Sequence, residues 1–154
     1  MYRPIIIINF AGMDFTDTEK YNFLDALTFV LLTVKKYMML PKYIEKWIVL
    51  IDLANISDFS FNKHLATSVF DYLGQHFIND ADRIYVYNPS QSFLFLWKAI
   101  QSRLWVMIVF INDEVLEYIS FVDGGNGKSV RECIDENNLL VQYAGAVRDF
   151  HPKW

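Results

Sequence analysis

Short runs of β-branched and aromatic residues alternate with longer stretches of helical periodicity, and this alternation restricts the possible folds more than any other feature. The runs lie at residues Arg3–Phe10, Trp47–Leu53, Arg83–Asn88 and Trp105–Ile111. They are nearly continuous in apolar residues, as strands buried on both faces are. Strands that alternate with helices form α/β folds. We therefore predict an α/β fold with a mixed, mainly parallel β-sheet flanked by helices, in a single domain over residues 1–154.

Helices are predicted between these strands from apolar residues three and four positions apart. Thr18–Met39 places five such residues toward a core: Phe23, Leu27, Val30, Leu31 and Val34. Asn62–Phe77 is a second helix, and Phe93–Arg103, capped by Ser90 or Ser92, is a third. Shorter elements complete the prediction, with helices at Asp113–Phe121 and Val130–Glu136 and a last strand at Leu140–Tyr143.

The composition is unusually apolar, with 53% hydrophobic and 17% aromatic residues. Such a surplus needs a large core, an apolar ligand cavity, or a surface that meets a membrane or a partner. The net charge is −4, and neither a basic run nor an aromatic RNA-binding motif occurs, so we expect no nucleic-acid partner.

Cys133 is the only cysteine, which excludes an internal disulfide and favours a reducing, cytoplasmic compartment. The N-terminal apolar run is too short for a secretion signal, and charges interrupt the stretch Phe23–Leu40 before it could span a bilayer.

The sequence gives no positive sign of catalysis, cofactor binding or metal binding. The segment Asp123–Ser129 contains Gly-Lys-Ser but lacks the earlier glycine of a phosphate-binding loop, so a surface turn is the better interpretation. The three histidines and the cysteine share no metal-ligand spacing, and no nucleophile motif is present. We therefore expect a protein that is not an enzyme and holds neither a cofactor nor a metal.

The segment Phe93–Trp97 contains five large apolar residues in succession. Successive residues of a helix are about 100° apart, so these side chains surround its whole circumference. A surface helix normally has a polar outer face. Two interpretations are open: a helix buried between the sheet and another element, or one with one face on a lipid cavity and the other toward a membrane or partner.

Several motifs resemble the CRAL-TRIO lipid-binding family, which includes the yeast phosphatidylinositol-transfer protein. Ile51-Asp52-Leu53 with Asn55-Ile56-Ser57 resembles the family's "(I/V)xDLxGxS" strand end, and Arg3-Pro4-Ile5 its opening strand. The segment Arg83–Pro89 is similar to a family strand that ends in an Asn-Pro turn, and Leu139–Gly145 to its closing "LPxxFGG".

The resemblance implies a sheet that forms the floor of a hydrophobic pocket, closed by a mobile gate helix at Phe93–Leu104. It implies binding, and transfer between membranes, of a lipid or other hydrophobic molecule, with transient membrane contact and no catalysis. The residues implied in ligand binding are Phe93, Leu96, Trp97, Ile100 and Leu104 on the gate, Met107 and Val109 on the sheet, and Ser57, which could instead form a local turn.

The departures from the family pattern also carry predictions. The family's helical N-terminal subdomain is missing, so we expect a minimal lipid-binding lobe or a fragment of a longer chain. Asn79-Asp80-Ala81 replaces the Pro-Glu-Arg turn, and Met107 or Ile108 replaces a lysine, both of which weaken the expectation of phosphoinositide recognition. The alternative hypothesis is a protein-interaction module of the same fold, such as an adaptor or small-GTPase regulator.

Overall fold

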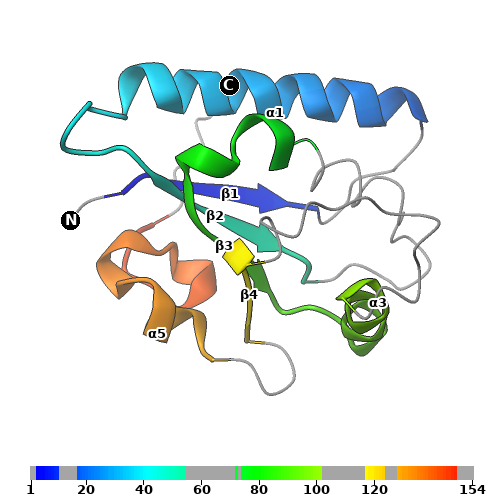
Figure 1. Ribbon diagram of the computed structural model, residues 1–154. Helices are drawn as coiled ribbons and strands as arrows, with labels where there is room; N and C mark the ends of the chain where they lie inside the picture. The colour runs from blue at the N-terminus through cyan, green and yellow to red at the C-terminus, as the bar shows by residue number, and fades with distance from the viewer. Residues whose placement is uncertain are drawn as a thin grey trace.

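A parallel four-stranded sheet forms the centre of the protein (Figure 1). The structure is a computed structural model that describes residues 3–10, 17–54, 72, 74–101, 117–123 and 128–148. The strands are β1 (Ile5–Asn9), β2 (Trp47–Asp52), β3 (Ala81–Tyr87) and β4 (Ile119–Val122). They lie in the order β1-β2-β3-β4, and each neighbouring pair is parallel.

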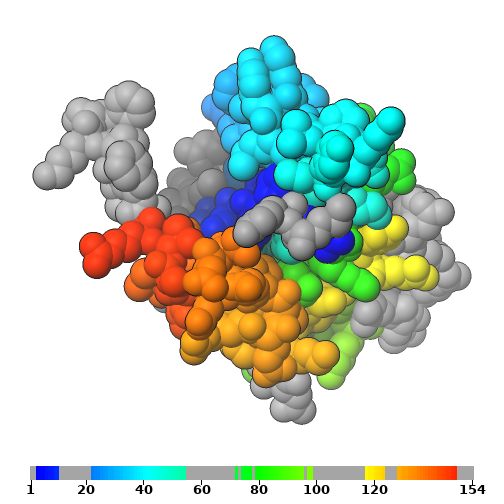
Figure 2. All heavy atoms as spheres, turned by 90° about the vertical axis from the view of Figure 1, so that its left-hand side faces the viewer, coloured from blue at the N-terminus to red at the C-terminus, as the bar shows by residue number. Residues whose placement is uncertain are grey.

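Helices lie on both sides of this sheet. The longest helix, α1 (Asp17–Tyr37), runs along one side, α3 (Gln91–Gln101) lies near the end where the strands finish, and α5 (Val130–Cys133) lies on the other side (Figure 1). Three short 3-10 helices complete the described elements: Ile78–Asp80, Glu136–Asn138 and Val141–Tyr143. Figure 2 shows the end where the strands begin, with the α1–β2 connection (cyan) above and the α5 segment (orange) below.

The strand register arranges apolar side chains in rows across the sheet. On one face, which we call the α1 face, Ile8, Ile51, Val86 and Phe121 occupy one row. Ile8, Ile51 and Val86 belong to the main core, which also includes Leu31 of α1, and the half-buried Phe121 packs against it. Burial against α1 therefore explains why alternate positions of each strand are apolar.

The opposite face, which we call the α5 face, is covered by the C-terminal segment. Leu50 lies at the centre of this second cluster, against which Ile7 and Tyr85 also pack. The segment contributes side chains from α5 and from the turns after it: Val130, Ile134, Leu139 and Tyr143. Because both faces are covered, the strands are continuous rather than alternating apolar runs, and the predicted α/β fold with a largely parallel sheet is confirmed.

Two predicted elements near the C-terminus differ from the structure. Asp113–Phe121 was expected to be helical; Glu117 and Tyr118 are helical, but Ile119–Val122 then pairs with β3 as strand β4. Leu140–Tyr143 was expected to be a strand, but Leu140 forms only an isolated bridge with Val147, and a 3-10 helix follows. At Ile119–Val122 the free edge of β3 offers backbone hydrogen-bond partners, and pairing with it outweighs the local preference for a helix.

Two details of the remaining elements also differ from prediction. Val30 was placed among the core-facing residues of its helix, but its side chain is 44% exposed. Asn88 precedes Pro89, a position that usually has extended backbone, whereas its φ is 48°. Asparagine tolerates this left-handed conformation better than most residues do.

Part of the predicted architecture lies outside the described residues. This applies to the strand at Trp105–Ile111 and to most of the helix at Asn62–Phe77, of which residues 72 and 74–76 are helical.

Candidate functional site

The predicted gate corresponds to α3, which begins directly after β3. Residues Asn88–Ser90 turn the chain away from the sheet, and Ser90 caps the helix. The Ser90 Oγ accepts a hydrogen bond of 3.1 Å from the Phe93 amide, and the Ser90 carbonyl accepts one of 3.0 Å from the Leu94 amide. The alternative cap, Ser92, lies inside the helix and is exposed. Ser90 thus fixes where the helix starts.

Three aromatic rings attach α3 to the sheet. Phe93 and Trp97 are one helical turn apart and stack with their ring centroids 6.4 Å apart. Each ring also makes an edge-to-face contact with Phe121 of β4, at 6.1 Å and 5.5 Å respectively. Such geometries are favoured by the charge distribution of aromatic rings. The contacts fix the rotation of α3 about its axis, with Phe93 and Trp97 toward the core.

The outer side of α3 carries one exposed aromatic ring, Phe95, with the exposed polar residues Ser92 and Lys98 about 60° to either side of it. Phe95 lies about 200° around the helix from Phe93, and its side chain is 77% exposed. Leu94, between them, is half-buried. At Phe93 and Trp97 the structure agrees with burial against the sheet, and at Phe95 it shows an apolar residue left in water. Phe95 was not among the residues expected to bind ligand.

The predicted ligand-binding residues are only partly described. Phe93 and Trp97 lie together in the main core, with 7% and 4% of their side chains exposed. Leu96 and Ile100 belong to α3, but their side chains lie outside the described part of the structure. The remaining four, Leu104, Met107, Val109 and Ser57, also lie outside it.

A buried polar contact at the carboxyl end of β2 was not anticipated. The Tyr143 hydroxyl donates a hydrogen bond of 2.8 Å to Oδ2 of Asp52, which is only 5% exposed. The other carboxylate oxygen, Oδ1, accepts a hydrogen bond of 2.8 Å from the Ala54 amide. Tyr87 packs edge-to-face on Tyr143, with the ring centroids 5.1 Å apart. Burial, then the hydrogen bond to Asp52, raises the pKa of Tyr143.

This contact connects two of the motifs that carry the family resemblance. Asp52 belongs to Ile51-Asp52-Leu53, and Tyr143 belongs to the closing segment Leu139–Gly145. An acidic residue at the end of an otherwise apolar strand was a signal for a polar contact there. Nothing in the sequence alone identified its partner.

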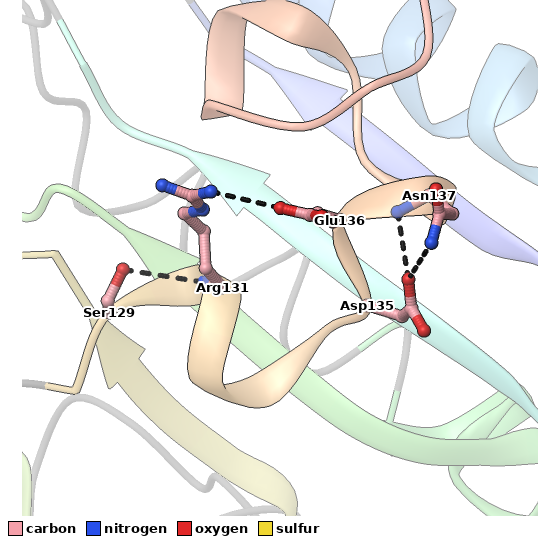
Figure 3. Close-up of polar contacts among 5 residues, drawn as sticks. All are labelled: Ser129, Arg131, Asp135, Glu136 and Asn137. Carbon is pink, nitrogen blue, oxygen red and sulfur yellow. Dashed lines mark hydrogen bonds and ion pairs between the residues drawn. The ribbon is translucent and has the colours of Figure 1, made fainter.

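Local hydrogen bonds shape the segment that carries Tyr143 to this position (Figure 3). Ser129 caps α5 by accepting a bond from the Arg131 amide, and Arg131 forms an ion pair of 3.0 Å with Glu136. The Asp135 carboxylate accepts bonds from the backbone and the side-chain amide of Asn137, at 2.8 Å and 3.0 Å. These turns fold the segment back over the α5 face.

Within the described residues no three or more histidine, cysteine, aspartate or glutamate side chains form a group that could hold a metal ion. No helix in the described part of the chain is long and apolar enough to cross a membrane.

Comparison with known proteins identifies the family. No curated protein matches the chain. The family model of the CRAL/TRIO domain matches residues 1–145. This match extends over almost the entire chain and includes the strands and the segment that carries Asp52 and Tyr143. The protein therefore belongs to the CRAL/TRIO domain family.

Proposed function

We propose that this chain binds a lipid or other lipophilic molecule and passes it between membranes, in the cytosol, without catalysing a reaction. Domains of the CRAL/TRIO family are generally ligand-binding and transfer proteins rather than enzymes. The observation that carries the proposal is the family match over residues 1–145. In this proposal α3 closes an apolar pocket.

The contacts of α3 with the sheet support a role as a gate. Phe93, Trp97 and Phe121 hold the helix against the sheet through apolar ring contacts. When the helix opens, a lipid acyl chain can take the place of the sheet as the apolar neighbour of these rings. Opening the helix onto a lipid therefore costs less free energy than exposing the same rings to water. Phe95, on the outer side, is placed to enter a bilayer while the helix moves.

The described polar groups favour an apolar ligand site without a dedicated phosphoinositide headgroup pocket. Both oxygens of Asp52 already accept hydrogen bonds from the chain itself. Asp80, in the turn where relatives with a headgroup site carry Pro-Glu-Arg, forms an ion pair of 2.7 Å with Lys35 of α1. These two carboxylates stabilise the fold, which leaves apolar contact as the main source of ligand affinity.

Native mass spectrometry of the purified protein tests whether it holds a lipid. We expect a mass increase that disappears after organic extraction, and a lipid in the extract that identifies the ligand class. A protein without bound lipid that also takes up no fluorescent phospholipid from vesicles contradicts the proposal. That result favours the alternative, a protein-interaction module of the same fold.

Exchange of a fluorescent lipid between two vesicle populations tests the role of α3. Phe95→Asp changes an exposed side chain, so we expect an intact fold and a several-fold slower exchange. Val141→Asp is the matched control, because Val141 is 57% exposed on the C-terminal segment, away from α3. Equal exchange rates for Phe95→Asp and the control contradict the gate.

A further inference from the structure

The C-terminal half of α1 and the connection that follows it expose an apolar surface. In Figure 2 these segments are the lighter blue and cyan atoms at the top of the view. We call it the α1 docking surface and define its apolar part by six exposed side chains: Phe29, Leu32, Tyr37, Met38, Leu40 and Tyr43.

Helix geometry places part of this surface on one stripe of α1. Phe29, Leu32 and Lys36 are spaced by three and four residues, so they lie within about 60° of one another around the helix. Phe29 is 72% exposed. The opposite side of α1 carries Leu27 and Leu31, which are buried against the sheet. The stripe is therefore the outer face of the helix, and the apolar residues on it are not needed for packing on the sheet.

The connection after α1 holds its exposed side chains in a defined turn. The Ile44 amide donates a hydrogen bond of 2.7 Å to the Leu40 carbonyl, and the Leu40 amide donates one of 3.0 Å to the Ile44 carbonyl. The Tyr43 amide also donates to the Leu40 carbonyl, at 2.9 Å. Within this turn Tyr43 is 71% exposed. The tyrosine is thus presented on an ordered turn of the backbone.

The local charge is opposite to that of the whole chain. Residues 29–46 contain four lysines and one glutamate, a net charge of +3, in a protein of net charge −4. Lys36 is exposed, with its ammonium group 4.9 Å from the centroid of the Tyr37 ring, and Lys42 is exposed in the turn. Lys35 instead pairs with Asp80. The apolar surface is therefore accompanied by positive charge.

Lys42 occupies its position in this turn in spite of an unfavourable backbone conformation. It follows Pro41 in the turn and has a φ of 72°. A turn with proline at the second position and a positive φ at the third normally has glycine or asparagine there. A lysine held at a positive φ is locally strained, and such strain points to a role for its side chain.

We propose that the α1 docking surface binds the surface of an anionic lipid bilayer. Aromatic rings and lysine side chains both favour the interface of a membrane, where the rings reach the acyl boundary and the ammonium groups meet anionic headgroups. A second copy of the chain is a poorer occupant, because a two-fold interface would bring Lys36 and Lys42 close to their equivalents. The surface does not involve α3, so it goes beyond the proposed gate.

Vesicle co-sedimentation compares phosphatidylcholine vesicles with vesicles in which about a third of the lipid is phosphatidylserine. We expect the protein to prefer the anionic vesicles and to lose that preference at high salt. The double variant Lys36→Glu/Lys42→Glu should bind them roughly tenfold more weakly or worse. Lys128→Glu/Arg148→Glu, two exposed residues elsewhere with the same change in net charge, should bind like the wild type.

Lys42→Gly separates the side chain's role from folding. It removes the strained backbone, so the urea midpoint should rise, while affinity for anionic vesicles should fall about fivefold. Tyr43→Asp should also weaken binding, and Val141→Asp should not. Equal losses for the two charge-reversal doubles, or unchanged binding of both Lys42→Gly and Tyr43→Asp, overturn the proposal. So does a concentration-dependent dimer that Tyr43→Asp abolishes without any effect on vesicle binding.

Native mass spectrometry keeps this test apart from that of the proposed function. We expect Lys36→Glu/Lys42→Glu to retain the same bound lipid as the wild type while it loses vesicle binding. A protein that carries no lipid but still binds anionic vesicles through these residues refutes the transfer function and leaves the docking surface intact.

Discussion

The Tyr143 hydroxyl and the Asp52 carboxylate form a buried hydrogen bond of 2.8 Å between residues 91 positions apart. The bond fastens the C-terminal segment to the carboxyl end of β2, in the middle of the sheet. Asp52 is the only buried polar or charged residue among those the structure describes. The two residues therefore fix how the α5 face is closed.

Tyr143→Phe should destabilise the protein by about 1.5–3 kcal/mol, because it leaves one oxygen of a buried carboxylate without its donor. The ring at position 143 and its contact with Tyr87 remain, so the decrease in the free energy of unfolding measures the contribution of the hydrogen bond. Urea unfolding followed by circular dichroism measures it. The control is Tyr43→Phe, which removes an exposed hydroxyl and should change stability by less than about 0.5 kcal/mol. Equal stability of the two variants would show that the bond contributes nothing.

The contribution of this hydroxyl should depend on alkaline pH. Burial and the bond to Asp52 raise the pKa of Tyr143 above its usual value of about 10. The unfolded chain therefore ionises first, and the stabilisation is fully present below about pH 10 and is lost as the pH rises toward the folded-state pKa. We expect the stability difference between wild type and Tyr143→Phe to shrink between about pH 8 and about pH 11. Burial also raises the pKa of Tyr85 and Tyr87, but the wild type and Tyr143→Phe both retain these tyrosines, so their effects cancel in the comparison. A stability difference that stays constant over this pH range would refute the prediction.

Ala144→Gly should stabilise the protein by about 1 kcal/mol. Ala144 ends the last 3-10 helix with φ 58° and ψ 27°, a left-handed conformation that glycine adopts without steric cost. The next position gives the opposite test. A methyl group on Gly145 would overlap the backbone of Leu139, so Gly145→Ala should destabilise strongly. Thermal unfolding of the two variants checks both signs, and a lower melting temperature for Ala144→Gly contradicts the argument.

Substitution by aspartate should change the stability of the protein very differently at Trp97 and at Phe95, although these residues are only two positions apart. Trp97→Asp places an unpaired charge in the main core and should cost more than about 3 kcal/mol or abolish cooperative unfolding. Phe95→Asp changes a side chain that is mostly in solvent and should cost less than about 0.5 kcal/mol. Near-native stability of Trp97→Asp would show that the ring is not held in the core.

The strands were the most predictable part of the fold. β1 and β2 are nearly continuous apolar runs of strand length, β3 is one from Ile84 to Tyr87, and burial on two faces explains that composition. β4 was missed because Ile119–Val122 is short and is preceded by polar and aromatic residues that suit a helix equally well. Its strand conformation depends on pairing with β3, which lies about 35 residues earlier in the chain.

The candidate site was predictable in its location but not in its orientation. The apolar segment at Phe93–Trp97 was correctly placed on a helix after β3. The five large apolar residues in succession include no polar side chain, so Phe93–Trp97 alone does not show which face of the helix points outward; only the flanking Ser92 and Lys98, each about 60° from Phe95, mark that side. Phe121 of β4 determines it, by contact with Phe93 and Trp97. The bond between Asp52 and Tyr143 depends in the same way on a fold that brings distant segments together.

The sequence offered Ser90 and Ser92 as alternative caps of α3, and from the structure we expect their alanine variants to differ in stability. Ser90 Oγ accepts a bond from the Phe93 amide, so Ser90→Ala should cost about 1 kcal/mol. Ser92 is exposed within the helix, where alanine is the better helix former, so Ser92→Ala should be neutral or slightly stabilising. Urea unfolding of the two variants measures the difference. If α3 is the gate, a frayed first turn also opens more easily, and Ser90→Ala should then exchange lipid faster than Ser92→Ala. Reversed stabilities of the two variants would assign the cap to Ser92.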